Sequence, residues 1–274
     1  MTIYIPWGGS PVWHELKYAL RSFEENIHTR FEVVIYGTFP KPEWLQNVTY
    51  VQTERFYPEG LESHYAGEKD FENWFDTLNK LRLFVHSEYC SEKFVYAFDD
   101  VLLLKTVESI YDIPNVPLNE IKNPKKKDTT KHEKTILEAV RLASENYHKF
   151  DGLRGKLGWY NYDTHMPRRY ERERWKKLFE IFPIEKQIIP YSSSTLYFNI
   201  YQPAFKSTTD EVNPWKASFM GELGRPDLFA SESIDDIKSA VTDKMWMNYS
   251  NNGLTQELIG YIGNRFSKKS RFEC

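Results

Sequence analysis

Two adjacent carboxylates, Asp99 and Asp100, are the residues of this chain best suited to chemistry. They end the apolar, aromatic run 94–98, and a second apolar run begins at Val101. Two acids at the tip of a buried strand are costly unless a cation lies beside them. Carboxylate oxygens suit Mg²⁺ or Mn²⁺, which can hold a diphosphate and neutralise its charge as it leaves. The pair therefore predicts a metal site in an enzyme that uses a nucleotide-diphospho-sugar, with Asp100 also in a catalytic role; the alternative is a turn whose acids cap the next segment.

A histidine loop is the second candidate for chemistry. His165 lies two residues after Asp163 and ahead of Pro167, and a charged segment follows. A histidine in a loop can act as a base, a phosphate partner or a metal ligand. We therefore predict catalytic roles for Asp163 and His165 at the acceptor or the phosphate. The alternative is an Asp/Thr turn that contains an incidental histidine.

Two polar turns are suited to binding the donor. One follows the first apolar run of the chain, and the other precedes the last helical pattern. We expect an aromatic ring to pack on the base and polar groups to hold the diphosphate or the sugar, although plain loops and helix caps have the same composition. The predicted donor-binding residues in these turns are Trp7, Gly8, Gly9, Asn251 and Asn252.

Basic residues gather in the segments 122–134, 168–177 and 265–271, although the formal net charge is −3. Charge runs are usually solvated faces, and part of the second segment has the spacing of a salt-bridged helix. If the acceptor is duplex DNA, phosphate contacts are expected from Lys125, Lys126, Lys127, Arg168 and Arg169. If the acceptor is a neutral glycan, aromatic side chains such as Trp159, Tyr160 and Tyr162 are expected to bind it.

The elements that must position these residues alternate between strands and helices. This order predicts an α/β fold with a mostly parallel central sheet flanked by helices, whose ligands bind beyond the carboxyl ends of the strands. The expected strands are 2–5, 31–36, 48–51, 94–98 and 195–198, and the expected helices are 12–27, 71–88, 131–149, 169–181 and 255–263.

The bulk composition places the chain among globular proteins. Its 274 residues, 41% hydrophobic and 27% charged, suffice for one catalytic domain. We expect residues 1–120 to bind the nucleotide sugar and residues 121–274 to form the acceptor side. The N-terminus shows no signal peptide and no membrane span, and Cys90 and Cys274 form no disulfide framework, so a cytoplasmic location is expected. Kinase, Rossmann oxidoreductase and serine hydrolase motifs are absent.

The order of motifs resembles the Stealth family, the sugar-phosphate transferases of capsular polysaccharide synthesis. The resemblance implies a GT-A-like nucleotide-diphospho-sugar transferase fold, a metal at Asp99 and Asp100, a functional His165, and Arg21 near the nucleotide or phosphate. It rests on blocks that span nearly the whole chain in the family's order: 15–24, 42–45, 94–102, 162–167, the turn 248–253 and 264–273.

Two departures from that family change the predicted reaction. The loop after the first strand carries Trp7-Gly8-Gly9-Ser10 in place of the family's Asp-Gly pair, and Asn251-Asn252 stands where the family has Asn-Asp. We therefore predict a metal-dependent glycosyltransferase of a bacterium or a phage-infected host. Its acceptor is a glycan of the cell envelope or, as in some phage enzymes, a modified DNA base. The alternatives are a sugar-1-phosphate transferase and a nucleic-acid- or glycan-binding module that has lost catalysis.

Overall fold

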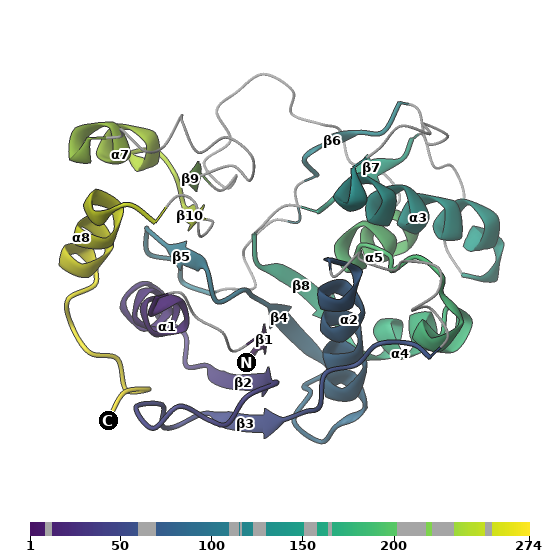
Figure 1. Ribbon diagram of the computed structural model, residues 1–274, viewed down its shortest axis with the longest axis horizontal. Helices are drawn as coiled ribbons and strands as arrows, with labels where there is room; N and C mark the ends of the chain where they lie inside the picture. Colours follow the sequence, from purple (N-terminus) through teal and green to yellow (C-terminus); the bar gives the residue numbers. More distant parts are fainter. Residues whose placement is uncertain are drawn as a thin grey trace.

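A five-stranded sheet forms the centre of the computed structural model (Figure 1). The structure describes residues 1–8, 13–59, 70–109, 115, 117–122, 130–150, 158–163, 166–201, 218–220, 233–249 and 254–274. The strands are β3 (Thr49–Gln52), β2 (Glu32–Gly37), β1 (Thr2–Trp7), β4 (Lys93–Tyr96) and β8 (Arg168–Glu171), in that spatial order. The first four are parallel and β8 runs antiparallel to β4, which confirms the α/β class with a mostly parallel sheet.

Two smaller sheets adjoin the central one. β10 (Trp246–Tyr249) pairs antiparallel with β5 (Val101–Leu103) and parallel with β9 (Ser218–Met220). β6 (Asn119–Glu120) and β7 (Tyr160–Asn161) form an antiparallel pair. Because β5 begins directly after Asp100, the turn with the acid pair joins the central sheet to the β5–β10 ladder.

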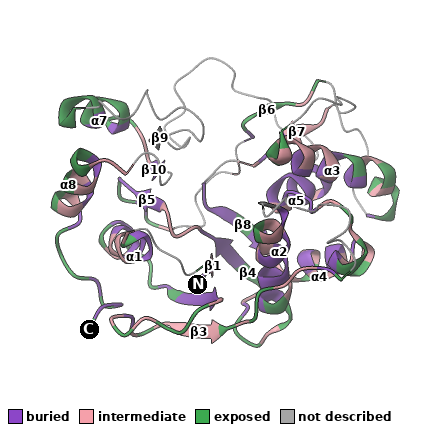
Figure 2. Ribbon diagram, in the orientation of Figure 1, coloured by how far each residue is buried: buried purple, intermediate pink, exposed green. Residues whose placement is uncertain are grey.

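The two faces of the central sheet differ in character. Alternate side chains of β1 point to opposite faces, so Ile3 and Ile5 join a largely aliphatic core while Tyr4 joins an aromatic one. The aliphatic core includes residues of α1 (Glu15–Asn26), α7 (Ile234–Val241) and α8 (Gln256–Arg265), and the aromatic core includes residues of α2 (Asp70–His86), α3 (Lys131–Asn146), α4 (Arg172–Ile181) and α5 (Ser193–Tyr201). Figure 2 shows the buried strands between these two sets of helices. Short 3₁₀ helices η2 (Tyr147–Lys149) and η3 (Ile184–Lys186) complete this side.

Polar residues on the buried stripe of α1 fix β5 against that helix. The Leu103 backbone N–H donates to Ser22 Oγ at 3.0 Å, and Asn26 Nδ2 donates to the Leu103 carbonyl at 3.0 Å. Ser22 is 0% exposed and Asn26 is 3% exposed. Because these bonds satisfy backbone groups that water cannot reach, they hold the β5–β10 ladder in place relative to the helix.

The structure corrects several expected elements. The segment 195–198 is not a strand but part of α5, whose residues from Ser194 to Ile200 are all buried. A helix that is buried all round lacks the one-sided apolar stripe, so a short apolar run there is ambiguous. The expected helix 169–181 begins as β8, where Arg168 and Tyr170 are buried, and becomes helical only at Arg172.

Smaller differences concern the ends of other elements. The first helix begins at Glu15 rather than at residue 12, and β1 extends through Trp7, which was expected in a loop. The helix expected over 131–149 changes to a 3₁₀ helix at Tyr147. Within the described residues, no helix has both the length and the apolar character needed to cross a membrane.

Candidate functional site

The turn between β4 and β5 carries Asp99 and Asp100 at the carboxyl end of the central sheet. β4 pairs with β1 so that Tyr96 lies opposite Tyr4, and the Ala97 N–H donates to the Tyr4 carbonyl at 2.8 Å. Ala97 and Val101 on either side are buried, whereas Phe98 and the two acids have intermediate exposure. The acid pair therefore lies where parallel α/β sheets bind their ligands.

A third carboxylate lies near the same strand end. Burial raises the pKa of Tyr96, and the charges of Tyr170, Asp163, Asp99 and Asp100 raise it further. Asp163 precedes β8, whose first residue pairs with Tyr96. The structure therefore brings Asp163 and the acid pair to the same ring, although they are far apart in the sequence.

Glu15 is a fourth carboxylate, which the sequence analysis missed. It is the first residue of α1 and is only 7% exposed. Burial raises the pKa of Glu15, and the negative charge of Asp100 raises it further. Hydrogen bonds from backbone N–H groups lower the pKa in part but do not cancel the increase. Burial also raises the pKa of Tyr249, with contributions from Glu15, Asp100 and Asp99. The charges of these three acids therefore all act on the Tyr249 side chain at the end of β10.

Two buried oxygens at this acid cluster have no hydrogen-bond partner among the described residues: Glu15 Oε2 and the Tyr249 hydroxyl. The sequence held a signal for Glu15, because it shares the buried helix stripe with Ser22 and Asn26. Polar residues on such a stripe require partners. Ser22 and Asn26 find theirs on β5, whereas the buried Oε2 of Glu15 has no partner among the described residues.

The donor set at the acid pair fits a hard divalent cation. Among the described residues, no group of three or more His, Cys, Asp or Glu side chains could hold a metal by itself. Mg²⁺ and Mn²⁺ are commonly bound by one or two carboxylates together with water and substrate phosphates. Asp99 and Asp100 match that mode, and the uncompensated oxygen of Glu15 adds negative charge to the same place.

A buried lysine organises the exits of β1 and β2. Lys80 Nζ donates to Asp76 Oδ2 at 2.5 Å, to Thr38 Oγ1 at 2.6 Å and to the Trp7 carbonyl at 3.2 Å. Asp76 in turn accepts the Phe56 N–H at 3.1 Å. Lys80 is 2% exposed and all three of its donors are used, so it ties α2 to the two strand ends. No sequence motif marks this residue, because two of its three partners, Trp7 and Thr38, come from other segments.

Trp7 does not have the predicted role. Its indole is 5% exposed, belongs to the aliphatic core and makes an edge contact with Tyr50 at 6.2 Å between ring centroids. A nucleotide base therefore cannot stack on it without opening the core, and that expectation is wrong. The exposed Gly8 follows directly, so the strand exit itself remains at the carboxyl edge of the sheet.

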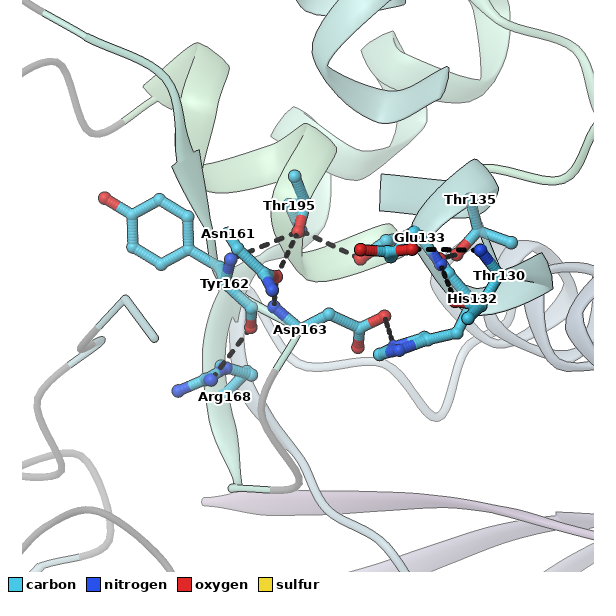
Figure 3. A network of polar contacts seen from close by, with 10 residues as sticks. Thr130, His132, Glu133, Thr135, Asn161, Tyr162, Asp163, Arg168 and Thr195 are labelled. Carbon is cyan, nitrogen blue, oxygen red and sulfur yellow. Dashed lines mark hydrogen bonds and ion pairs between the residues drawn. The ribbon is translucent and has the colours of Figure 1, made fainter. Parts of the chain in front are cut away.

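Asp163 pairs with a histidine that the sequence analysis did not consider. His132 Nε2 lies 2.9 Å from Asp163 Oδ2, as Figure 3 shows. The Asp163 N–H donates to Asn161 Oδ1 at 2.7 Å, and Thr195 Oγ1 donates to that same oxygen at 3.4 Å. The Tyr162 N–H donates to Thr195 Oγ1 at 3.1 Å. This network fixes the backbone that carries Asp163.

A tryptophan gives His132 a second constraint. The Trp74 and His132 rings are stacked at 6.2 Å between centroids with 8° between their planes. The imidazole side chain is 49% exposed, so it is held on two sides and still reaches solvent. His132 lies in the first turn of α3, after a capping box formed by Thr130 and Glu133. Its signal in the sequence is weak, because its partner lies in a segment 31 residues away.

Arg21 lies at the C-terminal segment rather than beside the acid pair. It forms a two-pronged pair with Glu273, at 2.7 Å from Nε and 2.7 Å from Nη2, and it donates to the Phe266 carbonyl at 3.0 Å. Although burial raises the pKa of Glu273, hydrogen bonds from Arg21 and Ser270 hold it below its usual range. Arg21 therefore anchors the end of the chain in the described structure.

The two arginines of β8 differ. Arg168 is 1% exposed and donates to the Tyr162 carbonyl at 2.9 Å, and burial lowers its pKa to about 10. A buried guanidinium cannot reach a DNA phosphate on the surface, so that expectation is wrong for Arg168. Arg169 points to the exposed face of the strand. Seven other predicted residues lie outside the described residues: Gly9, Lys125, Lys126, Lys127, His165, Asn251 and Asn252.

Comparisons with known proteins give similarity in structure but not in sequence. No protein-family model and no curated protein matches the chain. Among solved structures, it is similar to an active-site mutant of LgtC, with 12% identity, a TM-score of 0.46, and 99% of this chain and 98% of that chain covered. It is also similar to the galactosyltransferase LgtC in complex with donor and acceptor sugar analogues, with 13% identity, a TM-score of 0.43, and the same two coverages of 99% and 98%. The resemblance to Stealth blocks remains a prediction.

Proposed function

We propose that this protein is a GT-A-like glycosyltransferase that moves a sugar from a nucleotide-diphosphate donor to an acceptor hydroxyl. The observation that carries the proposal is the Asp99–Asp100 turn at the carboxyl end of β4, beside the exit of β1. Parallel α/β sheets bind ligands at this edge. A turn of two carboxylates there suits a donor whose diphosphate arrives with a divalent cation.

Each group around the turn has a defined part in this reaction. Asp99 and Asp100 would hold Mg²⁺ or Mn²⁺, which supplies charge neutralisation for a departing diphosphate. The acceptor oxygen attacks the anomeric carbon, the bond to the diphosphate oxygen breaks, and a nucleoside diphosphate leaves. Lys80 keeps the exits of β1 and β2 in position, which lets Gly8 border the donor without a side chain.

Asp163 and His132 supply the acceptor side. Their ion pair and the stack on Trp74 orient the imidazole at a rim that solvent reaches. A histidine held by a carboxylate can accept the proton that the acceptor hydroxyl loses. The predicted catalytic His165 lies outside the described residues, two positions from Asp163. It remains part of the proposal.

The described surface favours a glycan over DNA as the acceptor. Half-buried aromatic side chains, Trp74, Trp159 and Tyr160, lie in or next to the elements that carry His132 and Asp163, and such rings stack well on sugars. Of the basic residues assigned to DNA, Arg168 is buried and Lys125–Lys127 lie outside the described residues. Among the described residues, Arg169 is therefore the only predicted DNA-contacting residue whose side chain is exposed.

The test is product analysis with a panel of nucleotide sugars and Mn²⁺. Release of a nucleoside diphosphate that requires Asp99 and Asp100 supports glycosyl transfer. Release of a nucleoside monophosphate instead identifies the alternative, a sugar-1-phosphate transferase, because attack then occurs at phosphorus. Donor binding without turnover in every reaction of the panel identifies a binding module. Asp243→Asn, at an exposed aspartate, is the matched control for the acid variants.

A further inference from the structure

A cavity lined by cationic side chains lies at the end of the β5–β10 ladder that is remote from the acid pair. Its volume is about 240 Å³. Lys105 follows β5, Lys244 precedes β10, Lys238 comes from α7 and Arg265 from α8. Figure 1 shows α7 and α8 beside these strands. Two helices and the two loops next to β5 and β10 therefore bring four positive side chains to one hollow.

The charge of this cavity is only partly neutralised. Arg265 forms an ion pair with Glu25, and Lys238 lies 3.5 Å from Asp235. Among the described residues, Lys105 and Lys244 have no ion-pair partner. The C-terminus of α7 contributes a partial negative charge of roughly half an elementary charge. Two lysines outweigh this, so the hollow carries net positive charge.

Other lining groups complete a chemically defined surface. Tyr261 contributes a hydroxyl, while Leu104 and Val241 contribute apolar surface. The Thr242 hydroxyl also lines the hollow but donates to the Lys238 carbonyl at 2.6 Å. Hydroxyls and ammonium groups both donate to phosphate oxygens, and charge-assisted bonds of this kind are among the stronger ones in proteins. Apolar surface next to such donors suits an organic group attached to the phosphate. These features distinguish the hollow from a solvated run of lysines on a helix face.

The cavity is separate from the proposed donor site. Lys105 lies five positions after Asp100, and an extended chain rises about 3.3 Å per residue, which places the two roughly 16 Å apart along β5. The ladder keeps them apart, because the Leu104 N–H donates to the Met245 carbonyl at 2.9 Å directly at the cavity. One bound diphosphate therefore cannot occupy both places.

We propose that this cavity is a second binding site, for the phosphate group of an organic phosphate ester. Lys105 and Lys244 contact the phosphate oxygens, Arg265 and Lys238 contribute charge, and the Tyr261 hydroxyl donates to the same anion. Leu104 and Val241 contact the organic part. The phosphate can belong to a soluble ester or to the headgroup of an anionic lipid, since both present the same chemistry to the cavity.

Binding of phenyl phosphate and inorganic phosphate, measured by calorimetry in EDTA, tests the soluble source. Flotation with vesicles of phosphatidylcholine, with and without phosphatidic acid, tests the lipid source. The variant is Lys105→Ala/Lys244→Ala. The matched control is Lys41→Ala/Lys268→Ala, which removes the same charge from exposed positions elsewhere. Thermal unfolding checks that both variants fold.

Wild type and control should bind phenyl phosphate more tightly than inorganic phosphate, or bind only the vesicles with phosphatidic acid. The Lys105→Ala/Lys244→Ala variant should bind roughly tenfold or more weakly, the scale of losing charge-assisted hydrogen bonds. Binding to phenyl phosphate assigns a soluble source, and binding to vesicles alone assigns a lipid source. The proposal is overturned if wild type binds none of the probes, or if the control variant loses as much affinity as the cavity variant.

Discussion

The two ends of the β5–β10 ladder carry opposite charge. At one end the charges of Asp99, Asp100 and Glu15 act on Tyr249, whereas Lys105 and Lys244 flank the other end. Both ends rest on the same buried strand, which α1 holds through Ser22 and Asn26 on Leu103. One short ladder therefore presents an acidic cluster and a basic cluster, each suited to a ligand of opposite sign.

The contrast shows which kinds of site a sequence reveals. The acid pair is contiguous in the chain and interrupts an apolar run, so it is visible at once. The basic cavity is assembled from 104–105, 238–244 and 261–265, and each segment alone resembles an ordinary solvated surface. Because Asp99 and Asp100 are partly exposed and Lys105 is exposed, removing these charges should affect ligand binding more than stability.

The largest expected effect is at the acid end. Asp99→Asn or Asp100→Asn should lower kcat on the order of a thousandfold, because each removes charge that stabilises a leaving diphosphate. The thermal unfolding midpoint should change little, since both side chains are partly exposed. Steady-state release of nucleoside diphosphate measures the effect.

The exposed Asp243→Asn variant serves as the control and should retain full activity. If both single variants at the turn keep wild-type turnover with an unchanged metal requirement, the acid end is not the reaction centre.

The ion pair between Arg21 and Glu273 should behave in the opposite way, so that breaking it lowers stability and leaves turnover unchanged. Arg21→Met leaves Glu273 without its two-pronged partner in a site where the side chains are 12% and 2% exposed. Unfolding free energy should fall by about 2 kcal/mol, while turnover of the folded protein stays unchanged. Denaturant unfolding measures the first quantity and kcat the second.

The pH dependence sharpens this prediction. The pKa of Glu273 is below its usual range in the fold, so its contribution is present above the unfolded carboxyl pKa and is lost as pH falls through the folded value. The difference between wild type and Arg21→Met should therefore shrink in acid. A kcat or donor-affinity loss without a loss of stability would instead restore Arg21 to the nucleotide site.

The fold was more accessible from the sequence than the site. The strand β2, buried on both faces, follows from its continuous apolar run, and the helix α2 follows from its apolar spacing. α5 was mistaken for a strand because every side is buried, and β8 was mistaken for helix because its arginine is interior. Tertiary contacts decide whether such segments form a strand or a helix, and the spacing of apolar residues along the chain does not reveal those contacts.

The partners of the site residues also depend on tertiary contacts that the sequence alone does not reveal. Asp163 was predicted from its local turn, but its ion pair with His132 depends on how α3 docks beside α5. Lys80 and Glu15 escaped notice because a charged residue on a helix is normally exposed. The burial of Lys80 becomes visible only once the strand ends are in place, whereas Glu15 could have been found from the helix stripe that it shares with Ser22 and Asn26.

The next effect concerns the acceptor side. Asp163→Asn and His132→Ala should each lower kcat by about tenfold to a hundredfold, the range of a general base. Loss of stability should stay below about 1 kcal/mol, because the pair is partly exposed. Single-turnover kinetics with donor and acceptor measure the rate.

His148→Ala, at an exposed histidine of η2, is the control and should be silent. A double variant that is no slower than either single variant would show that Asp163 and His132 act as one unit. If the single variants unfold readily and keep full turnover, the pair is purely structural.

The smallest expected effect belongs to Glu15 and separates an acid cluster built for a ligand from one built for stability. Burial raises the pKa of Glu15, so its charge destabilises the fold at neutral pH, and stability falls as pH rises through the folded pKa. Glu15→Gln should therefore stabilise the protein at pH 7 by about 1 kcal/mol, the scale of an unsatisfied buried group. The gain should vanish below the unfolded carboxyl pKa.

Mn²⁺ should raise the unfolding midpoint of wild type more than that of Glu15→Gln, because the cation offsets the charge that the variant lacks. Glu257→Gln, in the exposed first turn of α8, should show neither effect. A variant less stable than wild type at pH 7, with the same response to Mn²⁺, would mean that Glu15 is satisfied within the fold and does not belong to the acid end of the ladder.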